Sequence, residues 1–313
     1  ESARDSLYYE GAEVHYFDGN CEASVESLTK YLNQFEKPIF GLNAHYYRAD
    51  CLTQLGKTQE ALSDFEYVAD RPKNKFTEPA LVQVARAAYA KGDCANALGH
   101  YKRLALLGEY TDNLLEAEIG QMRCNYELNN MQGAIASANM VLESANVNQK
   151  QKTEAYLIIG KANNQLNSPT EAIEFFSRVI ESGSNSQAAE AEYSLARIYY
   201  LNDSLDTAES IVFSVIENYK SEARWVAKSL LLLSDIYMAR GDLFQAKATL
   251  EAVIGNYTLD DDIPAMAQQK LDDIIEIEQR PLKEFEAEFE MIDIAPNDST
   301  KIEVEPNDTL NNE

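Results

Sequence analysis

The residues of this chain with the most obvious capacity for chemistry are its cysteines and histidines. There are four of the former and three of the latter: Cys21, Cys51, Cys94 and Cys124, and His15, His45 and His100. No two cysteines form a C-x-x-C pair and the histidines are widely separated, so the sequence predicts no metal site. The cysteines then have two possible states, disulfide bonds or buried free thiols.

No catalytic motif accompanies these residues. The chain has none of the phosphate-binding loops G-x-x-x-x-G-K-[ST] and G-x-G-x-x-G, the zinc motif H-E-x-x-H or the nucleophile motif G-x-S-x-G. The run Asp260, Asp261 and Asp262 lacks the alternating spacing and the closing Glu of an EF-hand loop, and it fits a solvated helix start. We therefore predict a protein that is not an enzyme and that needs no cofactor.

Charge narrows the classes of partner. The 313 residues include 52 acidic and 27 basic side chains, for a formal net charge of −25. A surface this negative repels phosphate backbones and anionic membranes, which argues against nucleic acid as a partner. The apolar runs, such as 230–233, are far too short to cross a bilayer, so no direct membrane insertion is predicted. Because residue 1 is Glu rather than Met, we expect a mature or trimmed form of a longer chain.

The elements that position these residues are organised as internal repeats. Four segments, beginning at Leu42, Glu78, Thr153 and Ala227, share one pattern. Each has an amphipathic stretch of about four helical turns, a turn with Gly or Asn, and a second stretch that opens near an Ala. Such a pattern predicts helical hairpins that bury their apolar faces against their neighbours.

These segments resemble tetratricopeptide repeats, in which a small residue of the first helix packs against a small residue of the second, with a large apolar residue four positions later. The matching small pairs are Ala49 with Ala61, Ala85 with Ala97, Gly160 with Ala172, Ala196 with Ala208, and Ser234 with Ala246. The large residues that follow are Phe65, Tyr101, Phe176, Val212 and Leu250. At the turn between the helices, where a positive φ suits glycine, stand Gly19, Gly56, Gly92 and Gly241.

The resemblance implies an all-α fold, a right-handed α-solenoid of about seven helix-turn-helix repeats over residues 1–258. The repeats begin near residues 5, 42, 78, 115, 153, 189 and 227, and repeats one and four match least well. Residues 259–294 are expected to cap the solenoid. A first capping helix would bury an apolar stripe, an interruption is expected at Pro281, and a second helix would follow. The stripe consists of Ile263, Met266, Leu271, Ile274 and Ile275. Residues 295–313 are predicted to be an acidic, disordered tail.

In the packing that the resemblance implies, the cysteines form two equivalent pairs. Cys21 and Cys94 are each seventeenth in their repeats, and Cys51 and Cys124 are each tenth in the repeats that follow. The second helix of one repeat packs antiparallel to the first helix of the next, which brings these positions to the same end of the stack. We predict the disulfides Cys21–Cys51 and Cys94–Cys124, with buried free thiols as the alternative.

The resemblance also implies a concave groove lined by the first helices. Its ninth and neighbouring positions carry four consecutive cations with tyrosines beside them, in a chain that is otherwise strongly acidic. The predicted groove residues are Arg86, Tyr89, Arg123, Tyr126, Lys161, Asn164, Tyr193, Arg197 and Tyr200. This surface suits a protein partner that presents an acidic peptide or a terminal carboxylate. Two alternatives stay open: the cations pair internally with Glu116, Glu154 and Glu190, or the chain's own acidic tail fills the groove.

Together, the repeats and the paired cysteines look like the periplasmic tetratricopeptide-repeat proteins of Gram-negative bacteria, those of Bacteroidota above all and, more distantly, the outer-membrane assembly lipoprotein BamD. The likeness implies a non-catalytic scaffold or adaptor for protein–protein interaction in a periplasmic cell-envelope or outer-membrane assembly. One alternative is a cytoplasmic co-chaperone-like peptide receptor, which reduced cysteines would favour. Another is a regulatory repeat domain of a larger sensor or enzyme.

Overall fold

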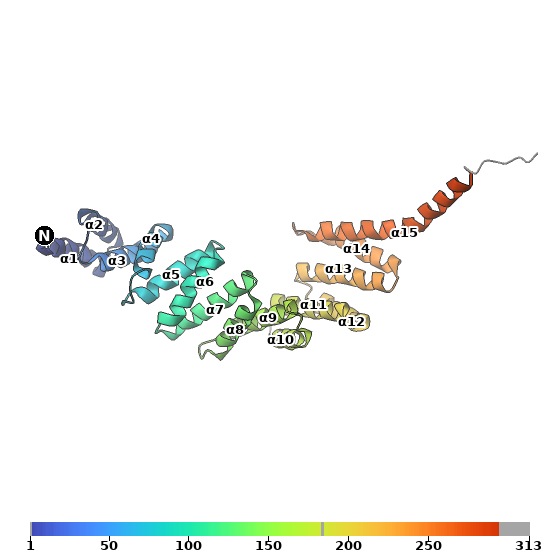
Figure 1. Cartoon of the computed structure of the whole chain (residues 1–313), viewed down its shortest axis with the longest axis horizontal. Coiled ribbons are helices and arrows are strands. Elements are labelled where there is room, and N and C mark those ends of the chain that lie inside the picture. The colour runs from blue at the N-terminus through green and yellow to red at the C-terminus, as the bar shows by residue number, and fades with distance from the viewer. Residues whose placement is uncertain (1, 183–184, 294–313) are drawn as a thin grey trace, which may run out of the picture. The chain divides into compact units, whose positions relative to one another are not determined.

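A computed structural model describes residues 2–182 and 185–293 of the chain (Figure 1). All regular secondary structure within these ranges is helical. The chain divides into two compact units, one ending at Val226 and the other beginning at Ala227, and each is described by itself.

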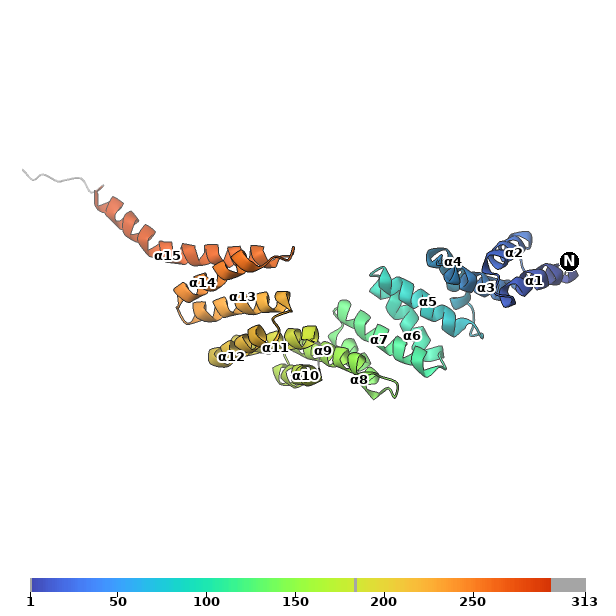
Figure 2. The same ribbon diagram turned by 180° about the vertical axis from the view of Figure 1, so that it is seen from behind.

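The first unit contains twelve complete helices, arranged as hairpins in chain order (Figures 1 and 2). They are α1 (Ser2–Phe17), α2 (Cys21–Gln34), α3 (Gly41–Gln54), α4 (Thr58–Ala69), α5 (Thr77–Ala90), α6 (Cys94–Leu107), α7 (Thr111–Glu127), α8 (Met131–Glu143), α9 (Gln149–Gln165), α10 (Pro169–Ser182), α11 (Asn185–Leu201) and α12 (Leu205–Asn218). Each helix packs against the next, and the first helices of successive hairpins also touch, as α5 does α7. This arrangement confirms the predicted all-α fold of stacked helical hairpins.

The predicted small residues lie where the two helices of a hairpin approach most closely. Ala49 of α3 and Ala61 of α4 are both fully buried, and Phe65 is 4% exposed. Gly160 of α9 lies against the ring of Phe176, since a Cβ added to it would stand 2.8 Å from that ring. A larger residue at such a position would separate the helices, which explains why the sequence alternates small and large side chains there.

Every hairpin turn places one residue at a positive φ. The four predicted glycines adopt values from 73° at Gly19 to 77° at Gly241. In repeats four to six the same position is taken by Asn129, Asn167 and Asp203, with φ near 60°. Asn and Asp tolerate this region better than other non-glycine residues, so the turn survives without glycine. The weaker match of repeat four therefore leaves its hairpin intact.

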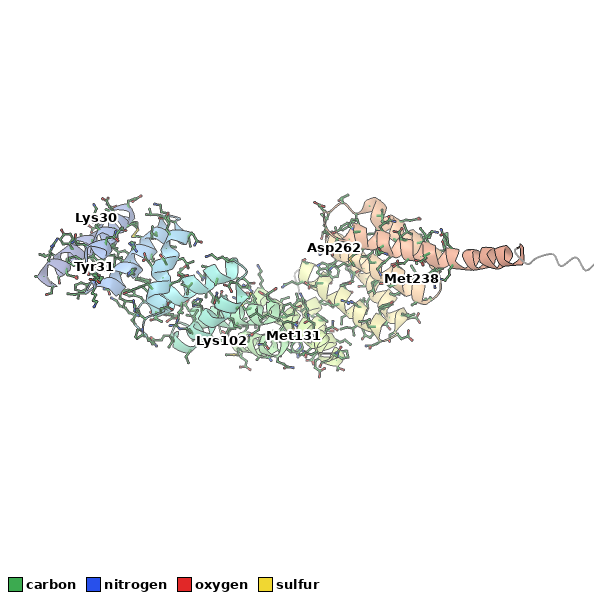
Figure 3. All side chains as sticks on the ribbon, turned by 45° about the horizontal axis from the view of Figure 1, so that its top comes forward. Lys30, Tyr31, Lys102, Met131, Met238 and Asp262 are labelled. Atoms are coloured by element: carbon green, nitrogen blue, oxygen red, sulfur yellow. A yellow bond between two sulfur atoms is a disulfide. The ribbon has the colours of Figure 1, made fainter. Side chains whose placement is uncertain are left out.

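Polar side chains anchor the first hairpins to each other. Tyr31 of α2 is fully buried, whereas its neighbour Lys30 points to solvent (Figure 3). The Tyr31 hydroxyl donates to Asp5 Oδ1 at 2.6 Å and accepts from the amide of Phe40 at 3.0 Å, while Asp5 Oδ2 accepts from the amide of Ile39 at 3.2 Å. These bonds join α1, α2 and the loop before α3 around one buried carboxylate.

The second unit consists of α13 (Ala223–Ala239), which begins just before the boundary, α14 (Leu243–Asn256) and α15 (Ile263–Asp293). Ala246 and Leu250 of α14 pack into one cluster with Ile263 and Ile274 of α15. From the expected stripe, Met266 is instead 43% exposed, and Ala267 takes the buried place.

Helix α15 runs through Pro281, where the sequence predicted an interruption. A proline has a helix-compatible φ, but inside a helix it removes one hydrogen bond and clashes with the carbonyl four residues earlier, at a cost of about 3 kcal/mol; α15 continues past it despite this cost. The predicted tail, 295–313, and Ile294 lie outside the described residues.

Candidate functional site

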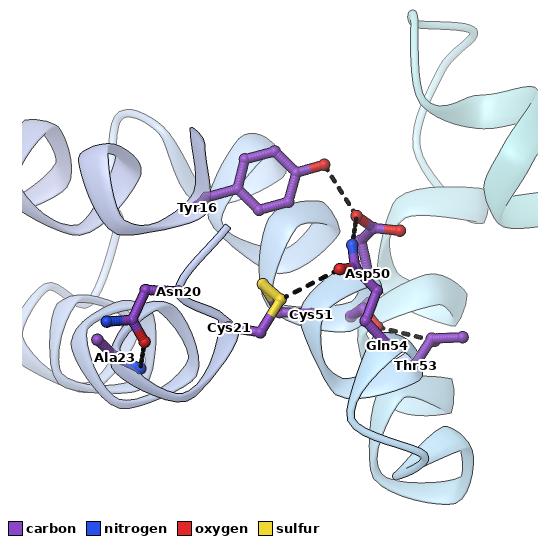
Figure 4. Close-up of a disulfide and its surroundings, with 9 residues drawn as sticks. Tyr16, Asn20, Cys21, Ala23, Asp50, Cys51, Thr53 and Gln54 are labelled. Atoms are coloured by element: carbon purple, nitrogen blue, oxygen red, sulfur yellow. Dashed lines mark hydrogen bonds between the residues drawn. A yellow bond between two sulfur atoms is a disulfide. The ribbon is translucent and has the colours of Figure 1, made fainter. Parts of the chain in front are cut away.

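A disulfide joins the first predicted cysteine pair, at the point where α2 begins beside α3 (Figure 4). The Cα atoms of Cys21 and Cys51 are 4.9 Å apart. Beside it, Asp50 Oδ2 accepts hydrogen bonds from the Tyr16 hydroxyl and from Gln54 Nε2, each at 2.9 Å. The position argument from the repeats was therefore correct for this pair.

The second predicted disulfide is not formed, and this prediction is corrected. Cys94 and Cys124 are free thiols, both buried. Burial, together with a hydrogen bond to Cys94, raises the pKa of Cys124 to about 12. This hydrogen bond shows that the repeat register brings Cys94 and Cys124 together as predicted, although no bond joins their sulfurs.

The predicted groove cations form ion pairs that link successive repeats. Three of the four predicted cations each bind an acid on the next first helix, in the pairs Arg86–Glu116, Arg123–Glu154 and Lys161–Glu190. Hydrogen bonding to the partner carboxylate raises the pKa of Arg123, as it does for Arg86. This is the internal pairing that the sequence left open, and it neutralises most of the positive charge that the groove was expected to carry.

The Arg123–Glu154 pair shows the geometry of these contacts. Arg123 Nε donates to Glu154 Oε1 at 2.5 Å, and its Nη2 donates to Oε2 at 2.8 Å. The guanidinium thus meets the carboxylate as a two-pronged fork, a charge-assisted arrangement with fixed orientation. The next cation, Lys161, contacts Glu190 at 2.8 Å and lies 5.1 Å from the ring centre of Tyr126.

Farther along the groove, Arg197 is exposed and forms no ion pair with the described residues. The rings of Tyr193 and Trp225 lie in contact at a tilt of 39°, with ring centres 5.6 Å apart. Asn164 and Tyr200 are half-buried on α9 and α11.

A pocket of about 480 Å³ lies between α5, α6, α7 and the start of α9. Of the predicted groove residues, Arg86, Tyr89 and Arg123 line this cavity, which is called the α5–α7 pocket below. The remaining six line other parts of the surface. The α5–α7 pocket therefore brings together three of the nine predicted groove residues, all from repeats three and four.

Other lining residues of the α5–α7 pocket were not predicted. Tyr101 of α6 forms part of its wall beside Gly120 of α7, and Asn148 and Gln151 contribute from the start of α9. A Cβ added to Gly120 would stand 2.5 Å from Tyr101 Cδ2, so only glycine leaves room for this ring. A glycine inside an otherwise regular helical stretch was the available signal for this close approach.

The α5–α7 pocket is suited to holding hydrogen-bond acceptors. A guanidinium carries five N–H donors, and the fork to glutamate uses only two of them. The side chains of Arg86 and Arg123 are 56% and 38% exposed, so donors remain within reach of a ligand. Burial raises the pKa of Tyr89, and that of Tyr101 to about 12, which keeps both hydroxyls neutral at physiological pH.

Two further properties bear on the kind of site. Nowhere in residues 2–182 and 185–293 do three or more His, Cys, Asp or Glu side chains gather closely enough to hold a metal ion. Among the same residues, no helix has the length and apolar character that crossing a membrane requires.

The fold is an all-helical solenoid built from successive hairpins. Residues 228–258, which cover most of α13 and α14, match the family model of the tetratricopeptide repeat. No curated protein matches the chain.

Solved structures share the fold at low identity. The C-terminal part of a tetratricopeptide repeat-containing protein from Cytophaga hutchinsonii is 15% identical, with 82% of this chain and 98% of that one covered and a TM-score of 0.55. A signal transduction ATPase with a tetratricopeptide repeat sensor, from Pyrococcus horikoshii, is also 15% identical, with 92% and 48% covered and a TM-score of 0.54. At such identity the likeness concerns the fold alone.

Proposed function

We propose that this protein is a non-catalytic scaffold that binds a segment of a protein partner in the α5–α7 pocket. The observation that carries the proposal is the pair of half-exposed guanidinium groups, held at fixed orientation by Glu116 and Glu154 and lining one cavity with Tyr89. Donors fixed before binding lose little conformational entropy when a ligand arrives. A scaffold site of this kind gains affinity from rigidity.

The favoured ligand is a peptide segment that presents a carboxylate or main-chain carbonyls. Because internal pairing neutralises most of the groove charge, attraction by net positive charge contributes less than the sequence implied. Directional hydrogen bonds from the unused guanidinium donors contribute more. A terminal carboxylate meets both requirements, and an acidic side chain within a peptide meets them as well.

We further propose an oxidising compartment of the cell envelope, the periplasm, as the place of action. The Cys21–Cys51 disulfide supports this, because such bonds persist in oxidising environments. Association with an outer-membrane assembly is part of the same proposal. Fully reduced cysteines in protein isolated with rapid alkylation would favour the cytoplasmic peptide receptor instead.

A photo-crosslinking experiment tests the proposed site. Tyr89 is replaced by p-benzoylphenylalanine in the full chain, cells are irradiated, and crosslinked partners are identified by mass spectrometry. The double variant Arg86→Lys with Arg123→Lys keeps both charges but removes the planar fork, so crosslinking should fall several-fold. The control is Arg178→Lys on α10, whose ion pair with Glu174 is similarly exposed and lies outside the pocket. Undiminished crosslinking in the double variant would refute the assignment.

A further inference from the structure

Helix α1 lies at one end of the first unit and has two apolar faces (Figure 1). The inner face packs against α2 and α3 and buries Tyr9 and Ala12. The outer face carries Leu7 and Val14, which are 69% and 55% exposed. The outermost helix of a repeat array normally has a polar outer face, which keeps the protein soluble. An apolar outer face on α1 therefore indicates a docking surface.

The later repeats show what normally covers this face. Leu7 is the third residue of repeat one, and Val14 is the tenth. The third residue of repeats two to six is a fully buried alanine, namely Ala44, Ala80, Ala117, Ala155 and Ala191. In each of these repeats the first helix packs against the second helix of the preceding hairpin, as α3 does against α2. Because α1 also packs against its own second helix and still leaves Leu7 exposed, the third position is covered by the preceding hairpin.

The size of Leu7 makes the outer face of α1 unsuitable for one more hairpin of the same kind. A second helix seated as in the later repeats leaves room for an alanine at the third position, and a leucine there would push it outward. Open space lies one turn farther along α1, at Gly11, where an added Cβ would meet nothing within 4 Å. The outer face therefore fits a helix that approaches most closely at Gly11 and not at Leu7.

The outer face also has a self-complementary order of charge. Alternating spacings of three and four residues, which are typical of a coiled-coil seam, connect Arg4, Leu7, Gly11, Val14 and Asp18. The Asp18 N–H donates to Val14 O at 2.9 Å, so Asp18 continues the helical register. The stripe thus begins with a cation, ends with an anion and has a glycine at its centre. Within the part of the chain that the structure describes, Arg4 and Asp18 form no ion pair.

We infer that the outer face of α1 binds the same face of a second copy of this chain, with the two helices antiparallel. Leu7 of each copy then meets Val14 of the other, and the two Gly11 residues lie at the two-fold axis. Arg4 of each copy meets Asp18 of the other at the two ends of the seam. A parallel pair would instead bring like charges together at both ends, which disfavours it.

The dimer goes beyond the proposed scaffold function and does not depend on it. It joins two copies of the α5–α7 pocket in one assembly. A partner that presents two acceptor segments would then bind more tightly than to a single chain, because the second contact forms within the same complex.

Sedimentation velocity of the full chain tests the dimer. A monomer–dimer equilibrium is expected between about 1 µM and about 1 mM, the range of complexes with a small interface. Leu7→Glu places a charge in the seam and should weaken dimerisation about tenfold or more. The control is Leu106→Glu on α6, where the leucine is 81% exposed and lies outside the outer face of α1, and it should leave the dimer unchanged. A chain that stays monomeric over this range would overturn the inference in favour of a different partner.

Charge reversal tests the antiparallel arrangement. Arg4→Asp alone and Asp18→Arg alone each replace two attractions by two repulsions, so each variant should dimerise several-fold more weakly at low ionic strength. An equimolar mixture of the two variants restores both attractions across a heterodimer, so dimers should return. No recovery in the mixture, or equal weakening by Leu106→Glu, would overturn the inference. An unchanged circular dichroism spectrum of each variant excludes misfolding as the cause of any loss.

Discussion

The contact between Gly120 and Tyr101 gives a sharp test of how the α5–α7 pocket is built. The change is Gly120→Ala, which adds a single methyl group to α7. That methyl carbon would stand 2.5 Å from Tyr101 Cδ2, whereas nonbonded carbons prefer about 3.5–4.0 Å, so the ring must move by roughly 1 Å or more. Tyr101 is only 4% exposed and forms part of the wall of the α5–α7 pocket, so a shift of its ring would deform that pocket.

Two opposing terms set the magnitude. Overpacking of a well-filled interior costs about 1–3 kcal/mol. Replacing glycine by alanine inside a helix returns about 0.5–1 kcal/mol. The net loss in free energy of unfolding should therefore be about 0–2.5 kcal/mol, and Gly99→Ala is the matched control. A Cβ at Gly99 meets nothing within 4 Å, so that change should stabilise by about 0.5–1 kcal/mol.

The assay is urea denaturation followed by circular dichroism, arranged as a double-mutant cycle. Tyr101→Leu introduces the residue type that Leu250 provides at the equivalent position of repeat seven, and it makes room beside α7. In that background Gly120→Ala should become neutral or stabilising. If its effect is the same in both backgrounds, the ring contact is not its cause and the packing argument fails.

Three further predictions concern other parts of the first unit. Asp64→Asn should cost about 3–5 kcal/mol at neutral pH, because the 2% exposed Asp64 accepts from Arg48 Nε at 2.7 Å and from His45 at 2.6 Å. Burial alone would raise the pKa of Asp64, but these bonds lower it overall. The difference in free energy of unfolding between the variant and the unmodified protein should therefore persist above about pH 4 and vanish as the pH falls through the folded-state pKa. A stability difference that does not change with pH in acid would contradict this. Asp203→Gly should raise stability by about 0.5 kcal/mol in thermal unfolding, because φ is 59° there and glycine adopts a positive φ without strain. The control Lys102→Gly, at an exposed helical site, should lower stability by about 1 kcal/mol. Equal losses at both sites would contradict strain in the turn. The double variant Cys21→Ala with Cys51→Ala should lower the free energy of unfolding by about 3 kcal/mol and remove the effect of reductant on stability. The double variant Cys94→Ala with Cys124→Ala should preserve that effect. Mass spectrometry after alkylation without reductant gives the number of free thiols.

Much of the fold follows from local sequence patterns. The period of apolar residues determines the helices, and the spacing of small residues such as Ala49 and Ala61 determines how each hairpin closes. The glycine turns were predictable because a positive φ is a property of a single residue. The repeat register predicted that Cys21 would meet Cys51, but it could not decide bond formation, since Cys94 and Cys124 hold the same positions and are free. Each of these depends on the chain within one repeat or on a repeated register.

The functional surface depended on distances that no local pattern contains. The sequence showed the cations Arg86, Arg123 and Lys161 and the acids that might oppose them, but only the packing of one first helix on the next decided that they pair. Whether a cation comes within contact distance of an acid on the next repeat depends on how the two helices pack, and their attraction weakens as the charges move apart.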